Sequence, residues 1–255
     1  MLKKFLKNEK LWKSLDKVKW IIASFGWPCA FIFWFQVMVV LYSSRGLMPQ
    51  ISLYIFHFLW IIITCSFFQA SFTPPLKCRD IVPIPENGWE GDYCDKCDYI
   101  KPKRWHHCRK CDRCVYRMDH HCPILQMCIH EDNHKFFLLF LCWPLILAIF
   151  TLSYGYYDLF MVFYSGFTFE KISTEQHYMG TGMSNSFMVG FAALYLLKFQ
   201  IPNLLRNQTL IEESRDDDRF DLGDWKSNFK SIMGPFITCW LPVKNQIKKK
   251  HMKIE

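Results

Sequence analysis

Seven of the chain's twelve cysteines lie between Cys94 and Cys128, interleaved with four histidines. They occur as CDKC at 94–97, HHCRKCDRC at 106–114, DHHC at 119–122, and a last cysteine at 128. Paired C-x-x-C units with nearby histidines are typical of zinc sites, where thiolates and imidazoles hold the metal tetrahedrally. A redox-active dithiol would account for one C-x-x-C unit but not for the whole cluster.

A count of ligands predicts two zinc ions and a surplus thiol. A structural zinc takes four ligands, so a single ion would leave most of the cysteines unused. Two ions, each held by three cysteines and one histidine, leave one cysteine and two histidines over. The spacing alone identifies neither the spare cysteine nor the pairing of the sites.

Cys122 has the neighbours that a nucleophile needs. It directly follows Asp119, His120 and His121. A carboxylate can orient an imidazole, and the imidazole can accept the proton of a thiol, which then attacks as thiolate. The alternative is that Cys122 is one more metal ligand.

Four apolar blocks must position this cluster. Each is close to the roughly 20 residues that a helix needs to cross a bilayer. One such block could be a buried core helix, but four in a chain of 255 residues predict a membrane protein. They are Trp20–Tyr42, Ile51–Phe72, Phe136–Tyr157 and, interrupted only by Lys198, Ser184–Ile201.

Basic residues predict how the spans are oriented. Lys and Arg number seven in 1–19, eleven in 73–135 and ten in 202–255, but one each in 43–50 and 158–183. Positively charged flanks stay on the cytosolic side. Both termini and the cysteine-rich segment are therefore expected in the cytosol, where disulfides are rare and metal sites are favoured.

The expected fold is thus an all-α polytopic membrane protein, with four transmembrane helices and a cytosolic zinc domain between the second and third. The segments are 1–19, basic and cytosolic; 20–72, spans one and two; 73–135, the cysteine-rich domain; 136–201, spans three and four; and 202–255, the cytosolic C-terminal segment. The net charge of +8 lies mainly beside the spans, where anionic lipid attracts it, so we do not expect nucleic acid as a partner.

The cysteine-rich segment resembles that of the DHHC protein S-acyltransferases, also called palmitoyltransferases. The run CDKCDYIKPKRWHHCRKCDRCVYRMDHHCP, followed by Cys128, Asn133 and Phe137, carries the resemblance. Its position between the second and third of four spans is also similar to the family's layout. The resemblance implies two structural zinc ions, one held by Cys94, Cys97, His107 and Cys114 and the other by Cys108, Cys111, His121 and Cys128.

The resemblance also implies an activity. Cys122 would be the nucleophile, His120 the base and Asp119 the orienting acid. Cys122 would take a fatty acyl group, typically palmitoyl, from acyl-coenzyme A and pass it to cytosolic cysteines of membrane-associated proteins. The anionic coenzyme A needs cationic contacts, for which we name Lys101, Arg104, His106 and Arg109. An endomembrane such as the ER or Golgi is the expected location.

Several positions depart from the family's pattern. Ile124 stands where the family usually has Trp, Met127 where it has Asn, and His130 where it has Gly. His130 could compete as a ligand, but an ordinary exposed histidine is the expectation. Thr73-Pro74-Pro75 replaces an Asp-Pro-Gly motif, and only Thr209 and Glu212 remain of a Thr-Thr-x-Glu motif. For Thr209, Glu212 and Asn228 we expect structural roles.

These departures leave an alternative open. The protein could be a weakly active or inactive relative that binds partners through its zinc domain and serves as a membrane scaffold. The retained Asp119, His120 and Cys122 argue against it, because a scaffold needs the zinc ligands but no nucleophile. A channel or transporter would place more ionisable residues in the spans than His57 and Lys198.

Overall fold

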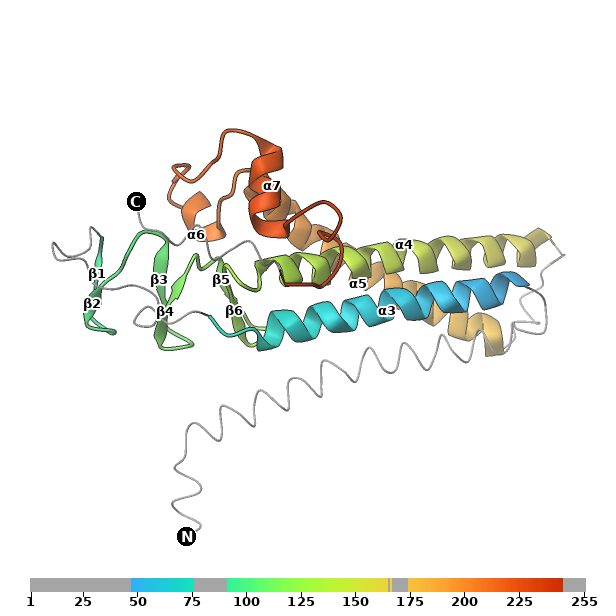
Figure 1. The fold of residues 1–255 in the computed structure, drawn as a ribbon. Coiled ribbons are helices and arrows are strands. Elements are labelled where there is room, and N and C mark those ends of the chain that lie inside the picture. The colour runs from blue at the N-terminus through green and yellow to red at the C-terminus, as the bar shows by residue number, and fades with distance from the viewer. Residues whose placement is uncertain (1–46, 76–90, 165, 167–173, 245–255) are drawn as a thin grey trace, which may run out of the picture.

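Three long helices lie side by side in the computed structural model (Figure 1). The structure describes residues 47–75, 91–164, 166 and 174–244, so the first apolar block and the basic segment 1–19 lie outside the described residues. The three helices are α3 (Leu47–Phe72), α4 (His134–Tyr164) and α5 (Thr174–Leu205).

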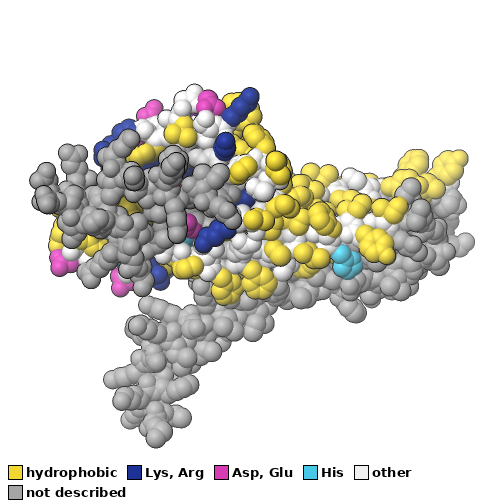
Figure 2. Space-filling model, viewed as in Figure 1, with side chains coloured by type: hydrophobic (Ala, Val, Ile, Leu, Met, Phe, Trp, Pro, Cys, Tyr) yellow, Lys and Arg dark blue, Asp and Glu magenta, His cyan; other side chains and the backbone are white. Residues whose placement is uncertain are grey.

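Each of these helices contains a stretch long and apolar enough to cross a membrane. The stretches are Tyr54–Phe72, His134–Met161 and Gly182–Leu205. They confirm the second, third and fourth apolar blocks of the sequence as helices, with the third beginning two residues earlier than expected. Figure 2 shows hydrophobic side chains over the visible face of this helical part, whereas charged side chains gather at the end of the molecule that carries α6 and α7.

Small residues bring α4 and α5 close together. The buried positions of α5 recur every three or four residues, as expected for one packed face of a helix. Near its N-terminal half this face carries Ser186, Gly190 and Ala193. A Cβ atom added at Gly190 would lie 2.9 Å from the Cβ of Ala148, so only glycine permits this approach.

The cysteine-rich segment forms three short antiparallel hairpins, each of two strands. They pair β1 (Tyr93–Cys94) with β2 (Tyr99–Ile100), β3 (Trp105–Cys108) with β4 (Arg113–Tyr116), and β5 (His120–Cys122) with β6 (Met127–Ile129). The fold is mostly helical, as expected, but an all-α prediction did not include these strands.

The three hairpins use the same turn. Asp98, Asp112 and Gln126 each adopt a left-handed backbone, with φ of 57°, 49° and 50°. They are spaced 14 residues apart in the sequence. A single left-handed residue lets a chain reverse tightly, and Asp adopts that conformation more readily than most residues do. The hairpins are therefore three copies of one structural unit.

A buried polar joint connects the third hairpin to the helices. The Asn133 amide donates to the carbonyls of Ala70, at 3.0 Å, and Cys128, at 2.9 Å, and its oxygen accepts from the His130 amide at 2.7 Å. The His130 ring contacts the Thr73 carbonyl at 3.2 Å and is 1% exposed. The expectation of an exposed His130 is therefore wrong, because its ring fills the space between hairpin and helix end.

The C-terminal segment packs against the hairpins through α6 (Leu210–Glu213) and against α4 and α5 through α7 (Trp225–Met233). Thr209 begins α6 with a capping box: its hydroxyl accepts from the Glu212 amide, and the Glu212 carboxylate accepts from the Thr209 amide. The Asn228 side chain bonds Leu205, Asp221 and Leu222 and so ties α7 to the end of α5. These contacts agree with structural roles for all three residues.

Candidate active site and metal centres

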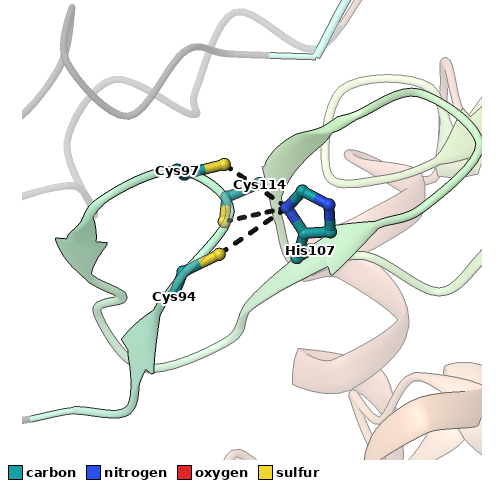
Figure 3. A group of neighbouring side chains, drawn as sticks. All are labelled: Cys94, Cys97, His107 and Cys114. Atoms are coloured by element: carbon teal, nitrogen blue, oxygen red, sulfur yellow. Dashed lines mark hydrogen bonds between the residues drawn. The ribbon is translucent and has the colours of Figure 1, made fainter.

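The first cysteine–histidine cluster gathers residues from two hairpins. Its ligand atoms, from Cys94, Cys97, His107 and Cys114, all lie within 4.8 Å of one another. Figure 3 shows the three sulfurs converging on Nδ1 of His107, at 3.6 Å, 3.3 Å and 3.9 Å. One nitrogen cannot hydrogen bond three thiols at once, so these distances describe the edges of a tetrahedron of ligands.

The second cluster repeats this arrangement one hairpin further along the chain. Nδ1 of His121 lies 3.6 Å from Sγ of Cys108, 3.4 Å from Sγ of Cys111 and 3.7 Å from Sγ of Cys128. The second hairpin contributes to both clusters, so the two interleave. The pairing agrees with the ligand sets that the family resemblance implies.

Both clusters fit zinc. Zinc–sulfur bonds of about 2.3 Å and zinc–nitrogen bonds of about 2.0–2.1 Å in a tetrahedron place N and S about 3.5 Å apart. The observed N···S distances scatter around that value. Nε2 of His107, the nitrogen that faces away from the sulfurs, lies 3.8 Å from the exposed Asp112 carboxylate, too far for a direct hydrogen bond. Each cluster could therefore hold a metal ion.

Cys122 belongs to neither cluster, although its hairpin is built like the others. Cys94, Cys108 and Cys122 are spaced 14 residues apart and each ends the first strand of its hairpin. In the first two hairpins a second cysteine follows three residues later, but in the third that position is Leu125. The hairpin of Cys122 thus lacks the second cysteine of a metal pair.

Asp119 and His120 form a closely held pair. Nδ1 of His120 and Oδ2 of Asp119 are 2.7 Å apart, and the carboxylate is fully buried. Asp119 also accepts from the Gln200 amide at 2.9 Å and from the backbone amide of Leu210 at 2.8 Å. Because Nδ1 of His120 faces the carboxylate, its other nitrogen, Nε2, is the one available to Cys122.

The electrostatics favour an ionised pair. Burial would raise the pKa of Asp119, but hydrogen bonds from His120 and Gln200 outweigh burial and hold it well below its usual range. Burial disfavours the charged ring of His120, but hydrogen bonds to Asp119 and Cys122 outweigh it and raise the pKa of His120 to about 9. The pair can therefore hold a proton taken from a thiol.

Cys122 opens onto an apolar cluster at the ends of the helices. Its side chain is 4% exposed and packs in one cluster with residues of all three long helices. The ring of Phe137 meets that of His120 edge to face, with centroids 5.2 Å apart. The cluster also contains Phe67, Ala70, Leu125, Ile129, Phe136, Leu141 and Leu197. The thiol thus lies between a polar pair and an apolar surface.

Ile124 and Met127, two of the departures from the family pattern, flank the thiol differently. Ile124 is 51% exposed and is not part of the apolar cluster of Cys122. Met127 is partly buried and packs against the apolar cluster of Cys122. Met127 therefore contributes to the packing around the thiol, whereas the exposed Ile124 side chain contributes little.

Three of the four residues named for coenzyme A line one cavity. Its volume is about 300 Å³, and Lys101, Arg104 and His106 lie in its wall, whereas Arg109 does not. The Arg104 guanidinium is already bound to Glu212, at 2.7 Å and 2.8 Å, and to the Asn207 carbonyl at 2.8 Å. Nε2 of His106 is buried and has no hydrogen-bond partner among the residues that the structure describes.

Sequence reasoning missed Gln200 and Leu210 as neighbours of Asp119. Gln200 is a buried amide within an apolar span, and such residues are rare enough there to be a functional signal. The Leu210 contact is made by its backbone amide, so the residue type at position 210 gives no sign of it. The 14-residue period, in which Leu125 takes the place of a second cysteine, could have identified Cys122 as the spare thiol.

Comparison with known proteins agrees with this geometry. A family model described as DHHC palmitoyltransferase matches residues 89–217. The search of curated proteins found no match. The matched segment covers slightly more than half of the chain and includes both clusters, Asp119, His120 and Cys122. On this evidence the chain belongs to the DHHC palmitoyltransferase family.

Proposed function

We propose that the protein is an active S-acyltransferase in which Cys122 is acylated by a fatty acyl-coenzyme A. The observation that carries this proposal is the position of Cys122, which lies outside both metal clusters, is close enough to His120 to help raise the pKa of that ring, and is buried among apolar side chains of three long helices. A scaffold would gain nothing from a thiol held beside an imidazole and a buried carboxylate.

In the first step, His120 accepts the proton of the Cys122 thiol while Asp119 holds the ring in place. The thiolate attacks the thioester carbonyl, a new carbon–sulfur bond forms, and coenzyme A leaves as a thiolate that takes up a proton. In the second step, His120 takes the proton of a protein cysteine, whose thiolate attacks the carbonyl of acyl-Cys122; the bond from that carbonyl to Sγ of Cys122 breaks, and the Cys122 thiolate takes the proton back from His120. Asp119 stabilises the charged imidazole that both steps require.

Two zinc ions would support this site without taking part in the reaction. We assign Cys94, Cys97, His107 and Cys114 to one ion and Cys108, Cys111, His121 and Cys128 to the other. A bound zinc cross-links four side chains and contributes directly to the stability of a small domain. The second ion would fix both ends of the hairpin that carries Cys122.

The cavity beside α6 is a suitable place for the anionic part of coenzyme A. Its wall combines Lys101, Lys103, Arg215 and the buried Nε2 of His106, which has no hydrogen-bond partner in the described part of the chain. The cavity lies next to the reaction site, since Glu212 lines it and Leu210, two residues earlier, bonds Asp119. Arg104 would support the wall, because Glu212 already binds its guanidinium. Arg109 lies outside the cavity and would at most attract the anion at long range.

The remaining features follow from the sequence. We propose that both termini and the metal clusters face the cytosol, with a fourth span at 20–42. The substrates would be membrane-associated proteins with cytosolic cysteines, presented beside the bilayer near Cys122. An endomembrane such as the ER or Golgi is the proposed location.

Autoacylation of the purified full-length protein tests the function. The protein would be incubated with acyl-coenzyme A of several chain lengths, and hydroxylamine-sensitive label would be measured. We expect thioester label at Cys122, with a preference for long chains because the thiol faces an apolar cluster. Absence of label at every chain length, in a protein that binds zinc, would favour the inactive scaffold instead.

A further inference from the structure

A chain of buried polar side chains leads away from Asp119 into the helices. Gln200 on α5 donates from Nε2 to Oδ2 of Asp119 at 2.9 Å. Its Oε1 faces Nε2 of His134, at the start of α4, at 2.9 Å. Nδ1 of His134 in turn faces Nη1 of Arg117 at 3.1 Å. All four side chains are at most 3% exposed.

Arg117, at the end of this series of four side chains, fixes the direction of every hydrogen bond in it. A guanidinium can only donate, so Nδ1 of His134 must accept and its Nε2 must carry the proton. That N–H donates to the oxygen of Gln200, which leaves the amide nitrogen of Gln200 to donate to Asp119. If the Gln200 amide were reversed, its oxygen would face the Asp119 carboxylate and its NH2 group would face the protonated Nε2 of His134, so neither hydrogen bond could form.

The same logic extends to the reacting groups. The carboxylate of Asp119 accepts from Gln200 and from the Leu210 amide, and so it is held in one orientation. In that orientation Oδ2 also accepts from Nδ1 of His120 at 2.7 Å. His120 is thereby kept in the tautomer and rotation in which Nε2 serves Cys122.

Arg117 is itself held by groups from outside the active site. Its Nη2 donates to Oδ1 of Asn207 at 3.1 Å, and its Nε lies 3.4 Å from the Glu131 carboxylate. Asn207 also donates to the Phe220 carbonyl at 2.9 Å. Arg117, the last member of the hydrogen-bonded series, is therefore held by the hairpin domain and the C-terminal segment together.

We propose that Gln200 and His134 are positioning residues for acyl transfer, which set the orientation of the Asp119–His120 pair and thereby the reactivity of Cys122. This inference rests on the proposed function but names residues outside the DHHC motif. Burying an amide and an imidazole in apolar helices costs free energy unless both groups are hydrogen bonded. Here the hydrogen bonds that satisfy Gln200 and His134 are the same ones that hold Asp119 in the orientation that His120 and Cys122 need.

The test compares Gln200→Met and Gln200→Glu in the full-length protein, with Ser186→Ala as the matched control. Met fills a similar volume but makes no hydrogen bond to Asp119. Glu keeps an acceptor for His134 but places a second carboxylate against Asp119. Ser186 is a buried polar residue on the same face of α5, hydrogen bonded by Thr151 at 2.7 Å and outside the chain.

Two rates are measured for each variant, together with zinc content. One is the rate at which iodoacetamide alkylates Cys122, followed on its peptide by mass spectrometry; the other is the maximal rate of autoacylation by palmitoyl-coenzyme A. We expect Gln200→Met to lower both rates by about tenfold or more, the loss of one hydrogen bond to a charged group, with half-saturation and zinc content unchanged. Gln200→Glu should be slower still, and Ser186→Ala unchanged.

The outcomes separate the inference from the proposed function. Normal alkylation in both Gln200 variants, with zinc content as in the wild type, would overturn the positioning role. Loss of zinc in both would assign the chain of hydrogen bonds to folding and overturn it as well. A wild-type protein that is never acylated would refute the proposed function, but the alkylation rates would still decide whether Gln200 controls Cys122.

Discussion

Cys122 stands in the third hairpin where Cys108 stands in the second. Each ends the first strand of its hairpin and follows a histidine, and 14 residues separate the two cysteines. Cys108 has a partner three residues on, in Cys111, and both belong to a metal cluster. Cys122 has Leu125 there, which is 3% exposed and packs into the apolar cluster around the thiol. The same hairpin structure thus presents a pair of metal ligands in the second hairpin and a single thiol in the third.

Cys122→Ser should separate catalysis from metal binding. We expect loss of hydroxylamine-sensitive label, because an acyl group on serine is an oxygen ester, and an unchanged content of about two zinc ions, because both ligand sets remain complete. Zinc content and acyl label would be measured on the same preparation. Cys239→Ser is the matched control, since Cys239 is buried but lies in a different apolar cluster. Thioester label that persists in Cys122→Ser would show that another cysteine is the nucleophile.

His121→Ala and Cys94→Ala should destabilise the protein through its metal sites. Each removes one of four ligands, and the hairpin of β3 and β4 contributes to both clusters, so damage to one site weakens the other. We expect at least one zinc ion to be lost, with a lower temperature of unfolding. The check is zinc content by elemental analysis together with thermal unfolding in detergent. Wild-type zinc content in both variants would refute the proposed ligand sets.

Much of this arrangement could be predicted from residue types. Uncharged blocks of span length predict helices, because a bilayer leaves the backbone no other partners. The number of cysteines and histidines predicts two clusters, because zinc demands a fixed set of ligands. The hairpin strands were not predicted, since they are two to four residues long and carry no alternation. Their common feature is the left-handed turn residue four positions after Cys94, Cys108 and Cys122, not hydrophobic periodicity.

The contacts of the active site were harder to predict because they join distant segments. Gln200 and Leu210 lie 81 and 91 residues beyond Asp119 in the chain. Nothing local to Asp119 specifies an amide on a helix or a backbone N–H at a helix start. His130 shows the same limit, since its burial depends on Thr73 at the end of α3. The residue types predict the reaction, but the residues that orient the reacting groups are brought together only by the fold.

Lys101→Ala should weaken the binding of acyl-coenzyme A more than Arg109→Ala does. Lys101 lines the cavity beside α6, whereas Arg109 lies outside it. Loss of one ammonium–phosphate contact raises the half-saturating concentration by about threefold to tenfold and leaves the maximal rate unchanged. Initial autoacylation rates over a range of palmitoyl-coenzyme A concentrations provide both quantities. Equal effects of the two variants would place the coenzyme A contact elsewhere.

The ion pair of Arg104 and Glu212 should stabilise the link between the hairpins and α6. Its two side chains are 9% and 3% exposed, and Arg104 also lies over the Phe220 ring at 4.2 Å. Removing one partner leaves a buried charge unpaired, so Arg104→Met should destabilise the protein by about 3 kcal/mol. Glu212→Gln should also destabilise it, because an amide cannot accept both hydrogen bonds of the guanidinium.

A double-mutant cycle measures this pair directly. If the charges interact, Arg104→Met with Glu212→Gln will cost less than the two single changes added together. The exposed pair of Arg219 and Asp217 is the matched control, since the Arg219 side chain is 67% exposed and Arg219→Met should leave the unfolding temperature unchanged. The Arg104→Met variant should also be acylated more slowly, because loosening α6 displaces the Leu210 amide from Asp119. Additive effects across the cycle, together with a wild-type rate of acylation, would show that the pair neither stabilises α6 nor supports the active site.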